Sequence, residues 1–313
     1  MSCIAKATIG ERSHVILILG SGLIGSAIAG ELSIRFSTVI HPIFIDWGKE
    51  KTNLLQNVYR QFAQVISKSI ENCAVEPKVH VIWAAGSSNF SSDNVETKYE
   101  LSIFSSCIKE TSNLVITQLS EPVSFHLASS IGGLFEGQYC VSLNSTPNPI
   151  RPYGHLKLSE ENLLSCHNDT IFGYVYRLSS VYGFVRPLQR KGLISTLIEN
   201  AMMGRVTVIS GSMCTLRDFV WAPDVARFIV RRIEEKQPSV EPVLLASGKS
   251  ETVENVKRLV EASLRRKVFS RYLYSPTNDA SICVSKSELP DVWIPSYVIS
   301  NIRRIVASYR YHR

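Results

Sequence analysis

The chain has 313 residues, of which 45% are hydrophobic, and its 34 lysines and arginines outnumber 27 acidic residues to give a formal net charge of +7. This length supports a substantial core in one large domain or two. No nucleic-acid recognition motif accompanies the basic clusters. We therefore interpret them as solvated helix faces and expect no nucleic-acid partner.

The N-terminal segment has one short apolar run, VILILG at residues 15–20. This run is too short for a signal peptide or a membrane span, and no later stretch approaches membrane length. We expect a soluble protein that does not bind a membrane. The seven cysteines are scattered, without C-x-x-C or a histidine at metal spacing. This pattern predicts reduced, buried thiols in a cytoplasm, with no disulfide framework and no metal site.

The first half of the chain alternates strand-like and helix-like segments. We expect strands over residues 14–19, 42–46, 79–86, 123–130 and 171–180, with helices between them that include residues 52–72. Apolar runs separated by helices indicate parallel strands covered on both faces. The sequence therefore predicts an α/β fold with a doubly wound parallel sheet, the Rossmann fold.

The pattern changes after residue 183. We expect helices near residues 190–203, 223–235, 252–264 and 296–308, separated by short strands such as RVTVIS and VLLAS. This region predicts a smaller mixed α/β domain. We therefore expect a nucleotide-binding domain over residues 1–180 and a substrate-binding region over residues 181–313 that is partly interleaved with it.

The first motif is GSGLIG at residues 20–25, placed between a buried strand and a helix. Glycines there allow a tight turn and close approach of the backbone to a pyrophosphate at the helix N-terminus. Asp46 follows about twenty residues on, where a carboxylate can accept both hydroxyls of an adenosine ribose. These features predict NAD. Lys49 and Lys51 follow closely and leave NADP open.

The second signal combines Ser129 and Ser130, which end a predicted strand, with Tyr153 and Lys157. The carboxyl ends of strands in an open α/β sheet are where ligands bind. Residues four apart on a helix share one face, so Tyr153 and Lys157 would be neighbours. A chain with twelve tyrosines contains such a pair by chance about as often as not, so the pair gains meaning only from the serines and the glycine turn.

Several blocks occur in a fixed order along nearly the whole chain, namely LGSGLIGSAIAGEL, VIWAAG, LASSIGGLFEG, PYGHLKLSEENLL, RLSSVYG, RDFVWAPDVARFIV, LLASGKSETVENV and NDASICVSKSEL. Together they resemble the extended short-chain dehydrogenase/reductase family, specifically its NAD-dependent nucleotide-sugar epimerases, dehydratases and reductases.

The resemblance implies a set of site residues. The catalytic residues would be Ser130, Tyr153 and Lys157, with Ser129 as the alternative serine. Cofactor contacts would come from Gly20, Ser21, Gly22, Leu23, Ile24, Gly25, Asp46, Trp47, Ala84, Ala85, Gly86, Ser129, Tyr153 and Lys157. Ser180 and Arg217 would contact the substrate, a nucleotide-diphosphate sugar. For Arg217, the alternative is a structural ion pair with Asp218 or Asp224. The family also implies a homodimer formed by helix packing.

The chain departs from the family pattern in three places. Leu19 stands where relatives have their first loop glycine, and Ser180 stands where many have asparagine. Relatives that dehydrate sugars place acidic residues directly after the catalytic serine or threonine, whereas Ser130 is followed by Ile131, Gly132 and Gly133. A dehydration needs a general acid and a base, so we disfavour that reaction.

The spacing of tyrosine and lysine has a physical reason. A free tyrosine, with a pKa of about 10, is a poor base at neutral pH, and its anion needs roughly 4 kcal/mol of stabilisation. A lysine ammonium about 5 Å away provides roughly 3 kcal/mol, and an oxidised nicotinamide adds a second positive charge. We expect Tyr153 to remove a proton from a sugar hydroxyl at C4 while Ser130 binds the same oxygen. The 4-keto sugar would then turn and be reduced on its other face.

Three functions remain open from the sequence. The first is an NAD-dependent nucleotide-sugar 4-epimerase, and the second is a 4-ketoreductase that consumes NAD(P)H. Both use the same Ser130, Tyr153 and Lys157, so the motifs do not separate them. The third is a non-catalytic nucleotide-binding regulator, which the intact serine, tyrosine and lysine disfavour.

Overall fold

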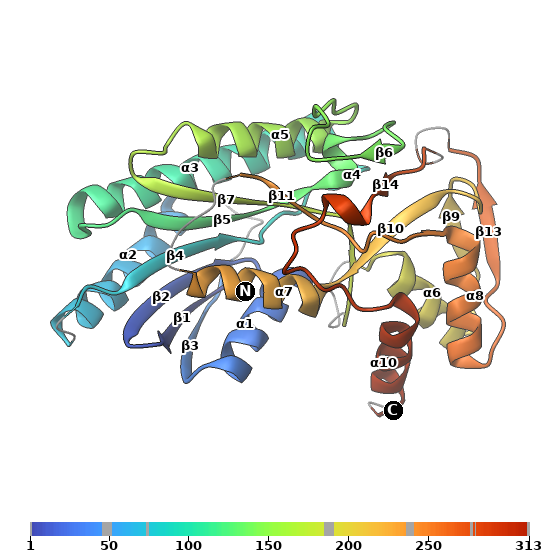
Figure 1. Ribbon diagram of the computed structural model, residues 1–313, viewed down its shortest axis with the longest axis horizontal. Coiled ribbons are helices and arrows are strands. Elements are labelled where there is room, and N and C mark those ends of the chain that lie inside the picture. The colour runs from blue at the N-terminus through green and yellow to red at the C-terminus, as the bar shows by residue number, and fades with distance from the viewer. Residues whose placement is uncertain are drawn as a thin grey trace. The chain divides into compact units, whose positions relative to one another are not determined.

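The computed structural model describes residues 2–45, 52–72, 75–184, 191–235, 241–275, 278 and 280–311. The chain divides into two compact units, each built from three segments (Figure 1). Unit 1 comprises Met1–Leu134, Pro149–Arg177 and Ala226–Pro242, and unit 2 comprises Phe135–Asn148, Leu178–Val225 and Val243–Arg313.

Unit 1 is built around a sheet. Its strands are β1 (Ser2–Ile9), β2 (Arg12–Leu19), β3 (Thr38–Ile43), β4 (Lys78–Trp83), β5 (Val123–Ser130) and β7 (Ile171–Leu178). They lie in the order β7-β5-β4-β2-β1-β3. β2 pairs with β4, and β4 with β5, in parallel register. The predicted α/β fold with a large parallel sheet is confirmed.

One strand of this sheet was not expected. β1 lies between β2 and β3 and pairs antiparallel with both. It forms a hairpin with β2 in which Ile9 is opposite Arg12, and Gly10 in the turn has φ 62°. Tight hairpin turns favour glycine at positive φ. β3 is therefore an edge strand, which tolerates Pro42, and it begins four residues before the predicted segment.

The helices of unit 1 are α1 (Leu23–Arg35), α2 (Thr52–Glu71), α3 (Asn94–Gln118), α4 (Ile131–Leu134), α5 (Pro152–Ser165) and, from Ala226 onward, α7 (Ala222–Glu234). Alternate strand residues such as Leu17, Val81 and Phe125 form a core with Phe62 of α2 and Phe104 of α3. Figure 1 shows α3 and α5 on one side of the sheet and α1 on the other.

A buried row of histidines crosses the sheet. His14, His80 and His126 are at most 4% exposed and come from β2, β4 and β5. His14 Nδ1 is 3.0 Å from His80 Nε2, and His80 Nδ1 is 3.2 Å from His126 Nε2. His126 Nδ1 is 2.8 Å from the Tyr176 hydroxyl. Each ring therefore meets the polar partners that a buried imidazole requires.

Unit 2 contains three small sheets, built from β6 (Cys140–Val141), β8 (Ser180–Tyr182), β9 (Thr207–Ser210), β10 (Leu216–Trp221), β12 (Ser250–Thr252), β13 (Ser270–Leu273) and β14 (Cys283–Val284). β11 (Val243–Leu245) is not part of them and is the strand next to β7 in the seven-stranded sheet. β10 lies between β12 and β8, β13 pairs with β9, and β14 pairs with β6.

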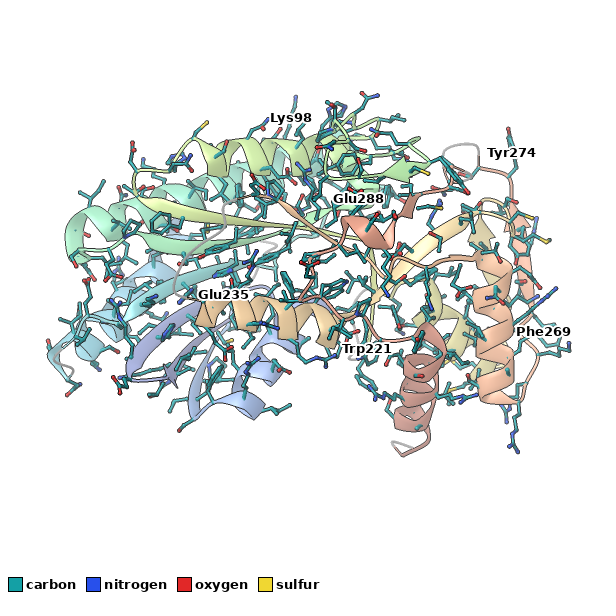
Figure 2. All side chains as sticks on the ribbon, in the orientation of Figure 1. Lys98, Trp221, Glu235, Phe269, Tyr274 and Glu288 are labelled. Atoms are coloured by element: carbon teal, nitrogen blue, oxygen red, sulfur yellow. The ribbon has the colours of Figure 1, made fainter. Side chains whose placement is uncertain are left out.

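The helices of unit 2 are α6 (Leu193–Met202), α8 (Val253–Leu264), the short 3₁₀ helix η1 (Lys286–Glu288) and α10 (Val298–Tyr311). α6, α8 and α10 match the helices predicted near residues 190–203, 252–264 and 296–308, whereas η1 was not predicted. Their apolar faces share a core with β8 and β10, where Trp221, labelled in Figure 2, lies 5.2 Å from Tyr182 between ring centroids.

The cysteine prediction was partly wrong. Cys107 is buried, but Cys140, Cys166 and Cys214 are exposed, and Cys73 lies outside the described residues. Cys140 lies in the two-residue strand β6, Cys166 follows the last residue of α5, and Cys214 lies in the turn before β10, where no apolar face has to be filled. No helix in the described part of the chain is long and apolar enough to cross a membrane.

The histidine row predicts acid sensitivity. Burial lowers the pKa of His126 from its ordinary 6.5 to about 3, and that of His14 to about 4. The rings are neutral in the folded protein and take up protons in the unfolded chain. Their contribution to the free energy of unfolding is therefore fully present above about pH 6.5 and declines as the pH falls. For His126 alone, the loss in free energy of unfolding from about pH 7.5 to about pH 5 is about 2 kcal/mol.

Urea unfolding at the two pH values measures this loss. We expect His126→Phe to reduce the pH-dependent loss by about that amount, whatever its effect on stability at neutral pH. His41→Gln changes an exposed histidine on β3 and should leave the loss as it is. An equal loss in the wild type and the His126 variant would contradict a neutral, buried ring.

Candidate active site

The glycine turn follows β2 and is sterically confined. Gly20 has φ 96°, and a Cβ atom there would lie 2.5 Å from the carbonyl oxygen of Ala84. A Cβ atom on Gly25 would lie 1.8 Å from the carbonyl oxygen of Gly20. Ala84 N donates to Leu19 O at 2.9 Å, which joins the turn to the end of β4. Only glycine satisfies the backbone at both positions.

The first turn of α1 is open. Gly22 is the residue before the helix, it provides no side-chain cap, and a Cβ atom on it would meet nothing within 4 Å. Leu23 and Ile24 begin the helix and are half-buried, and the Ser21 carbonyl accepts a hydrogen bond from the Ser26 hydroxyl at 2.8 Å. The first N–H groups of a helix lack partners within the helix, so this end suits an anion.

The adenosine end differs from the expected arrangement. Asp46 and Trp47 lie outside the described residues. β3, which precedes them, is separated from β2 by β1. The Ser2 hydroxyl at the start of β1 accepts a hydrogen bond from Gly20 N at 3.1 Å. The first strand of the chain therefore touches the glycine turn directly.

The two serines at the end of β5 have different partners. Ser129 is 5% exposed, and its hydroxyl donates to Glu161 Oε1 at 2.5 Å. Arg177 donates to the same carboxylate through Nε and Nη2, with the shortest distance 2.8 Å. Ser130 is half-buried, and its hydroxyl oxygen accepts from Gly133 N at 3.1 Å. The proton of the Ser130 hydroxyl is thus available to another acceptor.

Tyr153 lies in the first turn of α5. Pro152 starts this helix, which suits its fixed φ. The ring of Tyr153 lies 5.3 Å from that of Phe90 between centroids. A Cβ atom on Gly133 would lie 3.1 Å from the Tyr153 ring, and one on Gly132 would lie 3.0 Å from the Phe90 ring. The two glycines that follow Ile131 therefore leave room for the aromatic rings.

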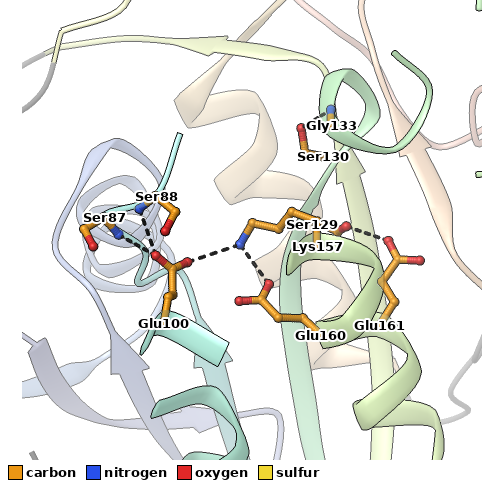
Figure 3. A network of polar contacts seen from close by, with 9 residues as sticks. All are labelled: Ser87, Ser88, Glu100, Ser129, Ser130, Gly133, Lys157, Glu160 and Glu161. Carbon is orange, nitrogen blue, oxygen red and sulfur yellow. Dashed lines mark hydrogen bonds and ion pairs between the residues drawn. The ribbon is translucent and has the colours of Figure 1, made fainter. Parts of the chain in front are cut away.

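Lys157 is buried between two carboxylates (Figure 3). Its ammonium nitrogen is 2.8 Å from Glu160 Oε2 and 3.7 Å from Glu100 Oε1. The side chain of Lys157 is 6% exposed, that of Glu100 is 5% exposed and that of Glu160 is 0% exposed. The ammonium nitrogen also lies 5.8 Å from the centroid of the Tyr153 ring. Tyr153 and Lys157 are neighbours, as their spacing predicts.

Glu100 joins this lysine to the loop after β4. Its Oε2 accepts from the backbone N–H groups of Ser87 at 2.9 Å and Ser88 at 2.8 Å. A Cβ atom on Gly86 would lie 2.8 Å from Glu100 Oε1. Ala84, Ala85 and Gly86, which we expected to contact the cofactor, begin this loop.

Sequence reasoning missed Glu100, Glu160, Glu161 and Arg177. Two of them carried a signal, because Glu160 and Glu161 stand three and four residues after Lys157 and therefore share its side of the helix. Glu100 and Arg177 come from other elements, and no spacing connects them with Lys157.

The buried charges shift one another. For Glu160, burial raises the pKa to about 7, with a further rise from Glu100 and an opposing effect of Lys157. For Lys157, burial alone lowers the pKa, but Glu160, Tyr153 and Glu100 outweigh it, so the pKa lies above its usual value. The lysine keeps its proton, and one carboxylate titrates near neutral pH.

The expected substrate residues lie in unit 2. Ser180 is exposed at the start of β8, opposite Phe219 of β10. The Arg217 guanidinium donates to the carbonyl oxygens of Ala280 and Asn278, both at 2.6 Å. Asp218 accepts from Ser247, and Asp224 accepts from Ser296. Backbone carbonyls therefore orient Arg217.

Known proteins resemble this chain at several levels. It is 31% identical over 140 residues to a Methanocaldococcus jannaschii protein provisionally named UDP-glucose 4-epimerase. That match covers 43% of this chain and 45% of the relative, so it spans less than half of the relative's length.

Two solved structures share the fold. The UDP-glucose 4-epimerase of Thermus thermophilus, complexed with NAD, has a TM-score of 0.74 at 18% identity, covering 94% of this chain and 98% of that one. MoeE5 in complex with UDP-glucose and NAD has a TM-score of 0.72 at 19% identity, covering 95% of this chain and 99% of that one.

The family assignment rests on a longer match. The sequence profile of the NAD dependent epimerase/dehydratase family matches residues 16–245. This range contains the glycine turn, both serines, Tyr153 and Lys157. The predicted resemblance to NAD-dependent enzymes of the extended short-chain dehydrogenase/reductase type is confirmed, and the chain belongs to the NAD dependent epimerase/dehydratase family.

Proposed function

We propose that this protein is an NAD-dependent nucleotide-sugar epimerase that acts at C4 through a transient 4-keto sugar. The observation that carries the proposal is that Tyr153 and Lys157 are neighbours on α5, with the ammonium nitrogen 5.8 Å from the ring centroid, while the Ser130 hydroxyl lies at the end of β5. The phenol oxygen of Tyr153 that would accept the proton, the Ser130 hydroxyl and the Lys157 ammonium come from β5 and α5 of the same unit.

The glycine turn fits the pyrophosphate of NAD. Gly22 faces open space, the first N–H groups of α1 have no partner within the helix and no side-chain cap from Gly22, and a Cβ atom on Gly20 or Gly25 would clash with the backbone. Ala84, Ala85 and Gly86 would contact the cofactor from the neighbouring strand end. When bound, NAD supplies the hydride acceptor that an alcohol oxidation needs.

Tyr153 would take the proton of the sugar hydroxyl, and Ser130 would donate a hydrogen bond to the same oxygen. We favour Ser130 over Ser129 because the Ser129 hydroxyl is committed to Glu161. Glu161 and Arg177 would thereby fix the end of β5 and the position of Ser130 that follows it. Proton removal by Tyr153 and hydrogen-bond donation by Ser130 both act directly on the sugar oxygen. Neither role needs a carboxylate next to the serine.

Residues of unit 2 would bind the nucleotide part of the substrate. MoeE5 binds UDP-glucose, and we propose a nucleotide-diphosphate sugar as the substrate of this chain as well. Arg217 would contact the diphosphate, since its guanidinium is already oriented by backbone carbonyls. Ser180 would make a shorter contact than the asparagine of relatives. The homodimer and the cytoplasmic location stay predictions.

A 4-ketoreductase that consumes NAD(P)H is the second candidate. It would use the same Ser130, Tyr153 and Lys157, so the arrangement that supports the epimerase supports it equally. A dehydratase is disfavoured because Cβ atoms on Gly132 and Gly133 would lie 3.0 Å from the Phe90 ring and 3.1 Å from the Tyr153 ring, so a carboxylate side chain at either position would require these rings to shift.

The first test is turnover of a panel of nucleotide sugars, followed by NMR and by the absorbance of the reduced nicotinamide. An epimerase inverts C4 without net reduction or oxidation, whereas a reductase consumes NAD(P)H with a keto sugar. We expect Tyr153→Phe to lower kcat by about a hundredfold or more. Tyr274→Phe, at an 87% exposed position, should retain full activity. Near-normal turnover by Tyr153→Phe would refute the assigned role.

The second test concerns the glycine turn. A methyl group at Gly22 enters open space in the free protein but occupies the position of the pyrophosphate, so we expect Gly22→Ala to weaken NAD binding at least tenfold in calorimetry. Its cost in free energy of unfolding should stay within about 1 kcal/mol. Gly30 lies within the helix that Gly22 precedes and also faces open space, so Gly30→Ala should bind NAD normally. Equal affinities for the two variants would place the cofactor elsewhere.

A further inference from the structure

Lys157, Glu100 and Glu160 form a buried set of three charged side chains. Along the described part of the chain, the titratable groups that face Glu160 are Lys157 on its own helix and Glu100 and Cys107 of α3. Trp83 of β4 also faces Glu160. Tyr153 interacts with Lys157, which in turn contacts Glu160. The Cys107 thiol stays neutral, because burial raises its pKa to about 12. One ammonium and two carboxylates thus decide the charge behind Tyr153.

The geometry holds the ammonium from two directions. Glu160 lies on α5 itself, three residues after Lys157, and makes the shorter contact. Glu100 reaches the same nitrogen from α3 and is anchored to Ser87 N and Ser88 N. Glu160 makes the shorter contact with the ammonium, its side chain is fully buried, and burial raises its pKa, so we assign the mobile proton of this set to Glu160.

We propose that Glu100 and Glu160 are positioning residues for Lys157, which hold its ammonium behind Tyr153 and, by binding and releasing one proton on Glu160, set how much of its positive charge reaches the tyrosine. This inference deepens the proposed function and rests on it. With Glu160 protonated, the set is neutral. With Glu160 ionised, it carries one negative charge, and proton removal by Tyr153 is disfavoured.

Carboxyl-carbon NMR of full-length protein labelled on its glutamates tests the charge set without any reaction. We expect one glutamate to titrate with a midpoint near pH 7, and its resonance to be absent from Glu160→Gln. The midpoint should move down in Glu100→Gln, which loses a like charge, and up in Lys157→Met, which loses the opposite charge. Glu96→Gln makes the same change at an exposed position one turn before Glu100 and should leave the midpoint in place.

The ring-oxygen-bearing carbon of Tyr153, assigned with Tyr153→Phe, reports whether the charge reaches the tyrosine. In the wild type its resonance should move through neutral pH with the midpoint of Glu160, and in Glu160→Gln it should stay still. In turnover assays, kcat of the wild type should fall about tenfold relative to Glu160→Gln as the pH rises through 7, as expected for one added charge at roughly 10 Å. KM should be unaffected by this titration.

The outcomes separate the two proposals. If the missing resonance titrates in the ordinary acidic range, or if Tyr153 responds equally in the wild type and Glu160→Gln, the role of the carboxylates is refuted. If both NMR results hold but kcat of the wild type does not fall relative to Glu160→Gln as the pH rises through 7, the charge does not control catalysis and the inference fails. If both NMR results hold and no nucleotide sugar is turned over, the proposed function fails and the positioning of Lys157 stands. Should Glu160→Gln not fold, the shift in Glu100→Gln decides.

Discussion

The buried ammonium of Lys157 is the constraint on which the site depends. Removing an ion from water costs several kcal/mol unless partners compensate it. Glu160 provides the nearest compensation, and Glu100 provides a second carboxylate that two backbone N–H groups hold in turn. The cost of burying one cation therefore fixes the relative positions of α5, α3 and the loop after β4. That loop leads from the strand end that faces the glycine turn.

Helix α5 supplies most of this arrangement from one face. The site residues on this helix are Tyr153 and, four, seven and eight residues after it, Lys157, Glu160 and Glu161. These positions form the stripe that an amphipathic helix usually fills with apolar side chains. Here Lys157, Glu160 and Glu161 are buried in this stripe, and the two adjacent glutamates contact different neighbours. Glu160 turns to Lys157, whereas Glu161 joins Ser129 of β5 to Arg177 of β7. One helix thus sets both the cation and the serine strand.

The sequence predicted the parts that depend on local pattern. The apolar runs predicted β2, β4, β5 and β7 with small errors at the strand ends. The tyrosine–lysine spacing correctly predicted that Tyr153 and Lys157 are neighbours. Glu100 could not be found in this way, because charged residues are usually exposed and nothing in α3 indicates a partner 57 residues away. The histidine row was equally hidden. His14, His80 and His126 meet only because three strands align in register.

The position of β1 changes what the spacing between the glycine turn and Asp46 implies. A carboxylate about twenty residues after the glycine turn reaches the ribose because the second strand of the nucleotide fold normally lies beside the first. Here β1 takes that place, so β3 is displaced by one further strand, about 4.8 Å. Ser2 at the start of β1 is bonded to Gly20. The start of β1, and not β3, therefore borders the glycine turn.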